Sequence, residues 1–210
     1  MRITILENLF HEFVSSDIEF LVLRNHEDIP GKISLTNDLD LLVKSNYNKI
    51  LQKIMHNYGF KMRKERFHHN IYLYKSLPHI HFYNFKNKLH VDVVNNLSYR
   101  SPNNNEWVSV HEQIQKSIWE NKLKTSFLWL YKPSAHDELI HLICHCLFDK
   151  RNFNNRYKLR IKELLTECDK YKLQNDLEHI FFKFTERLIT ILNNNEFDIL
   201  IQEYFSFSNY

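Results

Sequence analysis

Three aspartates in two otherwise apolar segments have the types and positions that divalent-metal chemistry requires. Asp38 and Asp40 lie in residues 37–43, and Asp92 lies in residues 90–94. The neighbouring residues are mostly leucine or β-branched, so both segments are predicted to be buried strands. A carboxylate in such a strand is costly unless positive charge offsets it. The pattern therefore predicts an acidic cluster that holds a cation.

The spacing of the first two aspartates places them on one face of their strand. Side chains alternate along a strand, so Asp38 and Asp40 point the same way with Cα atoms about 6.6 Å apart. The leucines and valine at positions 39, 41 and 43 then point to the other face. A third carboxylate from a neighbouring strand, Asp92, would complete a group able to hold Mg²⁺, or Mn²⁺ in its place, against a phosphate.

Each aspartate taken alone also has a structural interpretation. Asp38 could be a loop residue at the strand edge, and Asp40 could pair with a lysine. Asp92 could lie on a solvated face, because it shares one side of its strand with His90. The metal-site interpretation therefore depends on the occurrence of all three aspartates in this order.

Composition limits the classes of protein to which this chain could belong. Its 210 residues carry a net charge of +3, which makes a nucleic-acid-coating protein unlikely, and its two glycines exclude a glycine-rich phosphate loop. Three cysteines without a CxxC pair favour a reducing cytoplasm. Glu7 interrupts the apolar run that a signal peptide needs. Since no apolar stretch approaches about 18 residues, we expect no membrane span.

The first hundred residues show the pattern of a mixed α+β domain. A helix is expected over residues 3–15, and Ser45 is expected to cap a second helix over residues 46–57. The expected strands cover residues 18–24, 37–43, 60–66, 70–74, 80–85 and 89–94. The last four would form an antiparallel meander that ends at Asp92.

The second half of the chain is expected to be a helical domain over residues 106–210, following a linker at residues 101–105. Ser134 is expected to cap a helix that runs to about residue 149. Further helices are expected over residues 155–170, 173–191 and 195–205. Residues 127–131 form either one short strand or an extended docking segment.

Histidines and arginines in the second half are candidates for substrate contact. His141 and His145 are four residues apart on one helix face and could bind zinc, contact a substrate or serve the structure, as could the nearby His136. Arg156 and Arg160, one turn apart, could reach an anionic ligand or form a solvated helix face. Cys144 and Cys146 are expected to be small core residues.

Taken together, residues 20–30, the Asp-x-Asp strand at residues 37–43 and the distal Val91-Asp92-Val93 resemble the nucleotidyltransferase superfamily, which has a polymerase-β-like fold. More narrowly they resemble bacterial nucleotidyltransferase-like proteins, some of them encoded near surface-polysaccharide genes. The resemblance continues more weakly over residues 136–160. It departs at Arg24-Asn25, which stands where the superfamily usually has Gly-Ser.

The resemblance implies a mixed sheet flanked by helices in residues 1–100, followed by the helical C-terminal domain. It implies Mg²⁺-dependent transfer of a nucleoside monophosphate from a nucleoside triphosphate to a hydroxyl of a small acceptor, such as a sugar or sugar phosphate. Asp38 and Asp40 would bridge the metals and the phosphates, and Asp92 would hold the metal near the acceptor hydroxyl. Arg24 and Asn25 would bind phosphate. The candidates for lining the substrate cleft are His90, His136, His141, Arg156 and Arg160.

Two other classes stay open at this point. Arg24-Asn25 in place of Gly-Ser is compatible with a nucleotidyltransferase-like module that binds a ligand or partner without catalysis. A component of a toxin–antitoxin pair would also have this size and pattern. The nucleotide base, the acceptor and the oligomeric state are not specified by the sequence.

Overall fold

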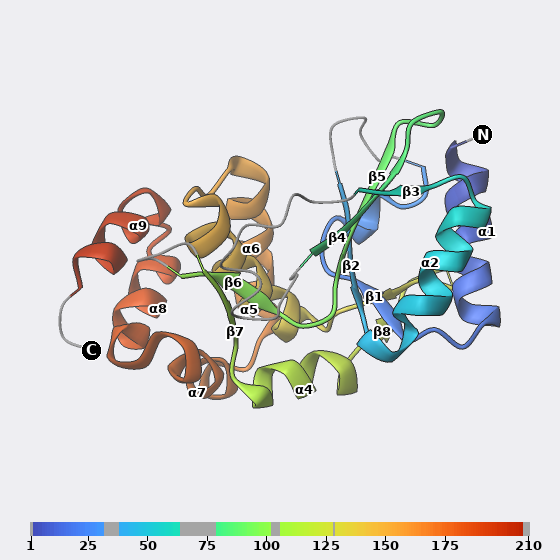
Figure 1. The fold of residues 1–210 in the computed structure, drawn as a ribbon. Helices are drawn as coiled ribbons and strands as arrows, with labels where there is room; N and C mark the ends of the chain where they lie inside the picture. The colour runs from blue at the N-terminus through green and yellow to red at the C-terminus, as the bar shows by residue number, and fades with distance from the viewer. Residues whose placement is uncertain (1, 32–37, 64–78, 102–105, 128, 208–210) are drawn as a thin grey trace. The chain divides into compact units, whose positions relative to one another are not determined.

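The computed structural model describes residues 2–31, 38–63, 79–101, 106–127 and 129–207. The chain divides into two compact units (Figure 1). The first unit comprises Met1–Asn96 and Leu123–Lys132, and the second comprises Leu97–Lys122 and Pro133–Tyr210. The first unit is therefore built from two separate stretches of the chain.

A five-stranded mixed sheet forms the first unit, and its strand order is β1-β2-β5-β4-β3. The strands are β1 Phe20–Val22, β2 Leu39–Val43, β3 Lys61–Met62, β4 His79–Asn84 and β5 Leu89–Val94. β2 and β5 are parallel, whereas the other neighbouring pairs are antiparallel. The predicted α+β class with a mixed sheet is thereby confirmed.

One face of this sheet is apolar and is covered by α1 (Arg2–Ser15) and α2 (Asn48–Asn57) (Figure 1). The alternation of side chains sends Leu41, Val91 and Phe82 from the three central strands into the same core. The helices contribute a stripe of buried residues at helical spacing, which comprises Leu6, Leu9, Phe10 and Phe13 from α1 with Leu51, Ile54 and Met55 from α2. The packing of the helices on this face leaves the opposite face for polar residues.

The strand and helix ends differ from the predictions in a few places. The expected strand over residues 89–94 matches β5, but β1 is shorter than the expected residues 18–24. Ser45 does not cap α2; it begins a 3₁₀ turn, Ser45–Tyr47, and no side chain caps α2 at Tyr47. Within the expected strand 60–66, only Lys61–Met62 is a strand among the described residues. The expected strand over residues 70–74 lies outside them.

A short hairpin of β8 (Leu123–Lys124) and β9 (Tyr131–Lys132) completes the first unit. Leu130 is fully buried in the core of the sheet. Trp129 stacks on Phe10 with ring centroids 5.7 Å apart, and Tyr131 meets the edge of Phe20 at 5.8 Å. This returning segment therefore contributes aromatic contacts to the α1 side of the core.

The second unit is mainly helical, as expected, with one short hairpin. β6 (Ser98–Arg100) pairs with β7 (Trp107–Ser109), and neither strand was expected. The helices are α4 Glu112–Glu120, α5 Ala135–Cys144, α6 Asn155–Glu167, α7 Lys170–Phe181, α8 Thr185–Asn193 and α9 Phe197–Ser206. Most of the expected linker, residues 102–105, lies outside the described residues.

Capping and backbone conformation explain where two of these helices begin and end. Ser134 caps α5 as predicted, because its side chain accepts a hydrogen bond from the Asp137 amide. A π-helical turn, His145–Lys150, continues α5. The single helix predicted over residues 173–191 is wrong: Phe182 has φ of 48°, which ends α7 and separates it from α8.

No helix in the described part of the chain is long and apolar enough to span a bilayer.

We predict that Leu41→Ala lowers the free energy of unfolding by about 2–5 kcal/mol, because it leaves a cavity in the centre of the sheet. Leu41 is fully buried, whereas Leu123, in the same unit, is 48% exposed. Leu123→Ala is the matched control and should change stability by at most about 0.5 kcal/mol. Urea unfolding followed by fluorescence measures both, and equal losses would contradict the assigned core.

Candidate active site

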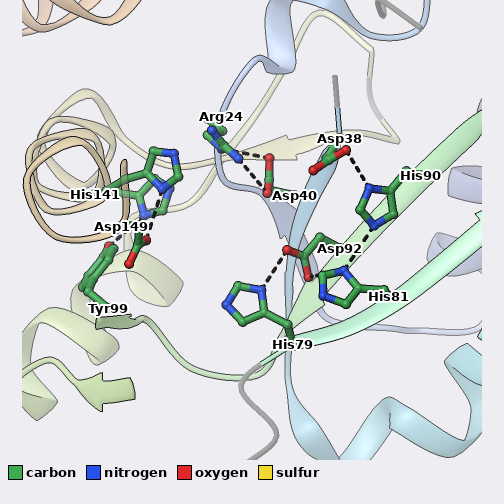
Figure 2. A network of polar contacts seen from close by, with 11 residues as sticks. Arg24, Asp38, Asp40, His79, His81, His90, Asp92, Tyr99, His141 and Asp149 are labelled. Atoms are coloured by element: carbon green, nitrogen blue, oxygen red, sulfur yellow. Dashed lines mark hydrogen bonds and ion pairs between the residues drawn. The ribbon is translucent and has the colours of Figure 1, made fainter. Parts of the chain in front are cut away.

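Polar side chains gather on the face of the sheet that α1 and α2 leave uncovered. In the parallel pair β2–β5, Asp40 is the direct register partner of Asp92. Leu41 and Val93 are paired one step along and enter the core instead. The two aspartates predicted to share a site therefore lie side by side on one face (Figure 2).

Asp38 directly precedes β2 and is the most exposed of the three aspartates, with 45% of its side chain accessible. His90 Nδ1 donates a hydrogen bond to Asp38 Oδ1 at 2.6 Å. The ring of His90 also stacks on Tyr83, with centroids 4.3 Å apart and an interplanar angle of 6°. Asp38 is thus held toward β5 by an imidazole whose own orientation is fixed by packing.

Asp40 is bound by Arg24 through both carboxylate oxygens. Arg24 Nη2 donates to Oδ1 at 3.0 Å, and Nε lies 2.8 Å from Oδ2. The two side chains are only 11% and 13% exposed. The cation that offsets this strand carboxylate is therefore an arginine, not the lysine that the structural interpretation suggested.

Burial and the neighbouring Arg24 act in opposite directions on the pKa of Asp40. Loss of solvent raises the pKa of Asp40 above its ordinary value, and the charge and hydrogen bond of Arg24 lower it. The negative charges of Asp92 and Asp38 raise it further. The net direction is upward, so the three carboxylates together form a place where added positive charge is favourable.

Arg24 and Asn25 follow β1 and form the turn at which the superfamily usually has Gly-Ser. Asn25 has φ of 56° and ψ of 24°, the left-handed conformation, and it precedes the 3₁₀ turn His26–Asp28. Asparagine tolerates this conformation better than most residues with a Cβ. The absence of glycine therefore does not prevent a left-handed turn here, although Arg24 itself contacts Asp40 rather than projecting alone.

Two histidines of β4 surround Asp92, and sequence analysis missed both. His79 Nδ1 lies 2.7 Å from Asp92 Oδ2, and His81 Nδ1 lies 3.5 Å from Oδ1. His81 Nδ1 is also 3.1 Å from His90 Nε2, so His90 lies between Asp38 and the β4 histidines (Figure 2). The available signal was His-x-His at the start of the strand expected over residues 80–85, since His81 lay inside that strand and His79 directly before it.

The oxygen atoms of this face fit a divalent cation. Asp92 Oδ1 is buried and makes no hydrogen bond in the described structure, whereas Asp40 Oδ2, also buried, is neutralised by the ion pair with Arg24 Nε. A buried carboxylate oxygen without a hydrogen bond, such as Asp92 Oδ1, is costly, and a bound cation would satisfy it. Carboxylate oxygens are also the ligands that Mg²⁺ prefers. Asp38, Asp40 and Asp92 could therefore hold such an ion.

The histidines predicted in the second unit each have a partner within that unit. His136 Nε2 lies 2.8 Å from Asp176 Oδ2, and the Tyr99 hydroxyl lies 2.7 Å from His141 Nδ1 (Figure 2). Within the described ranges, His79, His81 and Asp92 are the one group of three histidine, cysteine or acidic side chains whose ligand atoms all lie within 4.8 Å of one another; the oxygen atoms of Asp38, Asp40 and Asp92 are not drawn together that closely. The zinc interpretation of His141 and His145 therefore finds no ligand set there.

The remaining candidates lie on α5 and α6. Arg160 donates from Nε and Nη2 to the two carboxylate oxygens of the buried Glu138, at 2.9 and 2.7 Å. Glu138 raises the pKa of Arg160 through these hydrogen bonds. Arg156 is exposed on the preceding turn. Cys144 and Cys146 are fully buried, which confirms their predicted place in the core.

The fold and the paired strand aspartates define a nucleotidyltransferase-like protein. The sequence model of a family described as "Uncharacterised nucleotidyltransferase" matches residues 32–181. This match covers more than half of the chain, so the protein belongs to that family, as the sequence resemblance predicted. No curated protein matches the chain.

A solved structure supports the fold independently. The antibiotic-resistance factor ANT(2'')-Ia, studied in solution, aligns with a TM-score of 0.54 over 92% of this chain and 96% of its own. The two sequences are only 8% identical. The likeness thus confirms a nucleotidyltransferase fold and indicates nothing about substrates.

We predict that Arg24→Gln lowers the free energy of unfolding at pH 7 by about 3 kcal/mol, because it leaves a buried carboxylate without its cation. When folding raises the pKa of a carboxyl group, the folded protein loses stability as the pH rises above the pKa of that group in the unfolded chain, about 3.9 for aspartate. The pKa of Asp40 is already raised, and losing Arg24 raises it further. The deficit of the variant should therefore grow between pH 4 and pH 8.

Urea unfolding at several pH values between these limits measures the effect. In the Asp40→Asn background, where no carboxyl titrates at this position, Arg24→Gln should cost an amount that does not vary with pH in this range. A deficit that is equal at pH 4 and pH 8 with Asp40 intact would contradict the assigned pairing.

Proposed function

We propose that this protein transfers a nucleoside monophosphate from a nucleoside triphosphate to a hydroxyl group of a small acceptor, using Mg²⁺. The observation that carries the proposal is the register pairing of Asp40 with Asp92, with Asp38 on the same side of β2. Membership of the nucleotidyltransferase family supports the class of reaction. The acceptor proposed is a sugar or sugar phosphate, which is the expectation from the sequence resemblance.

The three aspartates would share the work by position. Asp38 and Asp40 would hold the ion against the phosphates, and Asp92 would hold it beside the acceptor hydroxyl. When bound, Mg²⁺ neutralises charge on the transferred and leaving phosphates and lowers the pKa of the acceptor hydroxyl. Reactions of this type need mainly positioning and electrostatic stabilisation, which a rigid sheet provides.

Arg24 would serve the site in two states. In the described structure its guanidinium neutralises Asp40. When a cation takes over that neutralisation, the planar fork of Arg24 is suited to a phosphate oxygen pair instead. Asn25 would present its backbone in the left-handed turn beside it. Through this exchange of partners, Arg24-Asn25 could bind a triphosphate although Gly-Ser is missing.

The histidine and arginine candidates differ in the contacts that they make, and we assign their roles accordingly. His90 stays a proposed substrate-side residue, because it touches Asp38 directly. We assign no substrate role to His136, His141 or Arg160, whose side chains make strong contacts within the second unit. Arg156, exposed on α6, stays a candidate for contact with an anionic group.

A binding module without catalysis is the competing function, and one observation favours it. Arg24 holds both oxygens of Asp40 in the described structure, so a cation must compete with a guanidinium for that carboxylate. If no cation displaces the Arg24 guanidinium from Asp40, the chain would bind nucleotide weakly or bind a partner without turnover. Measuring pyrophosphate release together with nucleotide binding separates the two functions.

We predict that the protein releases pyrophosphate from a labelled nucleoside triphosphate in the presence of Mg²⁺ and a panel of sugar acceptors. Asp40→Asn and Asp92→Asn should each lower this rate by at least about 100-fold, since each removes a charge that stabilises the transition state. Asp17→Asn is the matched control, because Asp17 is exposed in the turn after α1, at the end of β1 opposite to Arg24. Its rate should equal that of the native chain.

Circular dichroism must show that the variants are folded. Turnover that persists in Asp40→Asn would reject the assigned site. Nucleotide binding without pyrophosphate release across the acceptor panel would instead favour the binding module.

A further inference from the structure

The polar face of the sheet carries imidazoles that phosphate-transfer chemistry does not require. His79 and His81 come from β4 and approach Asp92 from the side opposite Asp40 (Figure 2). We propose that His79, His81 and Asp92 form a binding site for a first-row transition-metal ion, such as Zn²⁺ or Fe²⁺. This site shares one residue, Asp92, with the site of the proposed function and adds two, His79 and His81.

Strand register brings the three side chains together. His81 is the direct partner of Asp92 in the antiparallel pair β4–β5, and His79 pairs with Val94 two residues along. Residues at positions i and i+2 share a face, so both histidines lie beside the carboxylate. Their rings stack with centroids 5.9 Å apart and an interplanar angle of 16°. One potential ligand atom from each of the three residues lies within 4.8 Å of the others.

The surroundings are partly dry yet accessible to an ion. The side chains of His79 and His81 are each 23% exposed, and that of Asp92 is 13% exposed. Asp92 Oδ1 is a buried oxygen that lacks a hydrogen-bond partner of good geometry. A coordinating ion would satisfy this atom, which two nearby imidazoles leave unsatisfied.

The donor atoms select the class of metal. Mg²⁺ prefers oxygen ligands and retains its water, whereas imidazole nitrogen suits zinc, copper, iron and nickel. Two imidazoles and one carboxylate leave coordination positions open for water or a ligand, as in metal sites that act on substrates. The set is therefore chemically distinct from the oxygen-only set of Asp38 and Asp40.

An outer layer supports the orientation of these ligands. His81 Nδ1 contacts His90 Nε2, and His90 is held in turn by Asp38 and by stacking on Tyr83. Metal-binding histidines usually have a partner on the ring nitrogen that does not bind the ion, which fixes the ring. In the described structure His81 Nδ1 faces both His90 and Asp92, so His81 would bind the ion through Nε2 and keep Nδ1 for His90. The alternative is that the imidazoles only donate to Asp92 and bind no ion. Under that alternative, replacing either histidine would leave the metal affinity of the isolated protein unchanged.

We predict that Co²⁺, used as a spectroscopic probe of the chelator-treated full chain, gives visible d–d absorption that saturates at one equivalent. The titration is made in the Asp40→Asn background without nucleotide, which removes the oxygen-only set. Zn²⁺ at comparable concentration should displace the Co²⁺ signal, and Mg²⁺ in large excess should not. His81→Asn and His79→Asn should each weaken Co²⁺ binding at least about tenfold, the loss that even an outer partner of a metal ligand causes.

His56→Asn is the matched control, because His56 is exposed on α2 and its loss removes one surface imidazole. It should leave the Co²⁺ affinity unchanged. Asparagine at position 79 can still donate to Asp92, so His79→Asn decides the question if His81→Asn does not fold. Equal Co²⁺ affinity in the native-histidine and His79→Asn proteins, or displacement by Mg²⁺, would overturn the proposal.

The result separates this inference from the proposed function. A histidine-dependent Co²⁺ site in a protein that never releases pyrophosphate would keep the metal site and reject the transferase. Pyrophosphate release with Mg²⁺ in a protein whose Co²⁺ binding ignores His79 and His81 would keep the transferase and reject the metal site.

Discussion

The parallel pairing of β2 with β5 is the constraint on which the rest of the first unit depends. It sets Asp40 beside Asp92 on one face and Leu41 beside Val93 on the other. Because side chains alternate, a slip of one residue would carry a carboxylate into the core and a leucine onto the polar face. The cost of that exchange fixes the register. The same apolar packing that stabilises the sheet therefore also positions the acidic site.

Charge balance on the polar face follows from this register. Three carboxylates on neighbouring positions repel one another, and one arginine and three imidazoles lie beside them. Arg24 provides a full charge to Asp40, while the imidazoles of His79 and His90 contact Asp92 and Asp38. A site balanced in this way is stable without an ion yet retains oxygen atoms that an ion can use. The proposals for both metals rest on this balance.

Sequence patterns were sufficient for the elements whose signal is periodic. Apolar alternation predicted β5 to the residue, and helical spacing predicted α1 and α5, because burial of one face determines both the pattern and the element. The Asp-x-Asp spacing likewise predicted that Asp38 and Asp40 share a side. Contacts between distant segments carried no such signal: the pairing of Arg24 with Asp40 and the place of His79 and His81 depend on strand order, which no local pattern encodes. The break at Phe182 was missed because its neighbours continue an apolar helical stripe through a residue with positive φ.

The β8–β9 hairpin makes the first unit discontinuous along the chain. Residues 123–132 leave the helical unit, supply Leu130, Trp129 and Tyr131 to the core around Phe10, and return. A fragment that stops at residue 96 would therefore lack Leu130 in its core and the contacts of Trp129 with Phe10 and of Tyr131 with Phe20. During synthesis, about thirty residues beyond residue 96 must be added before these contacts can form. Insertions or fusions that respect a simple boundary between the two units would break the packing of the first.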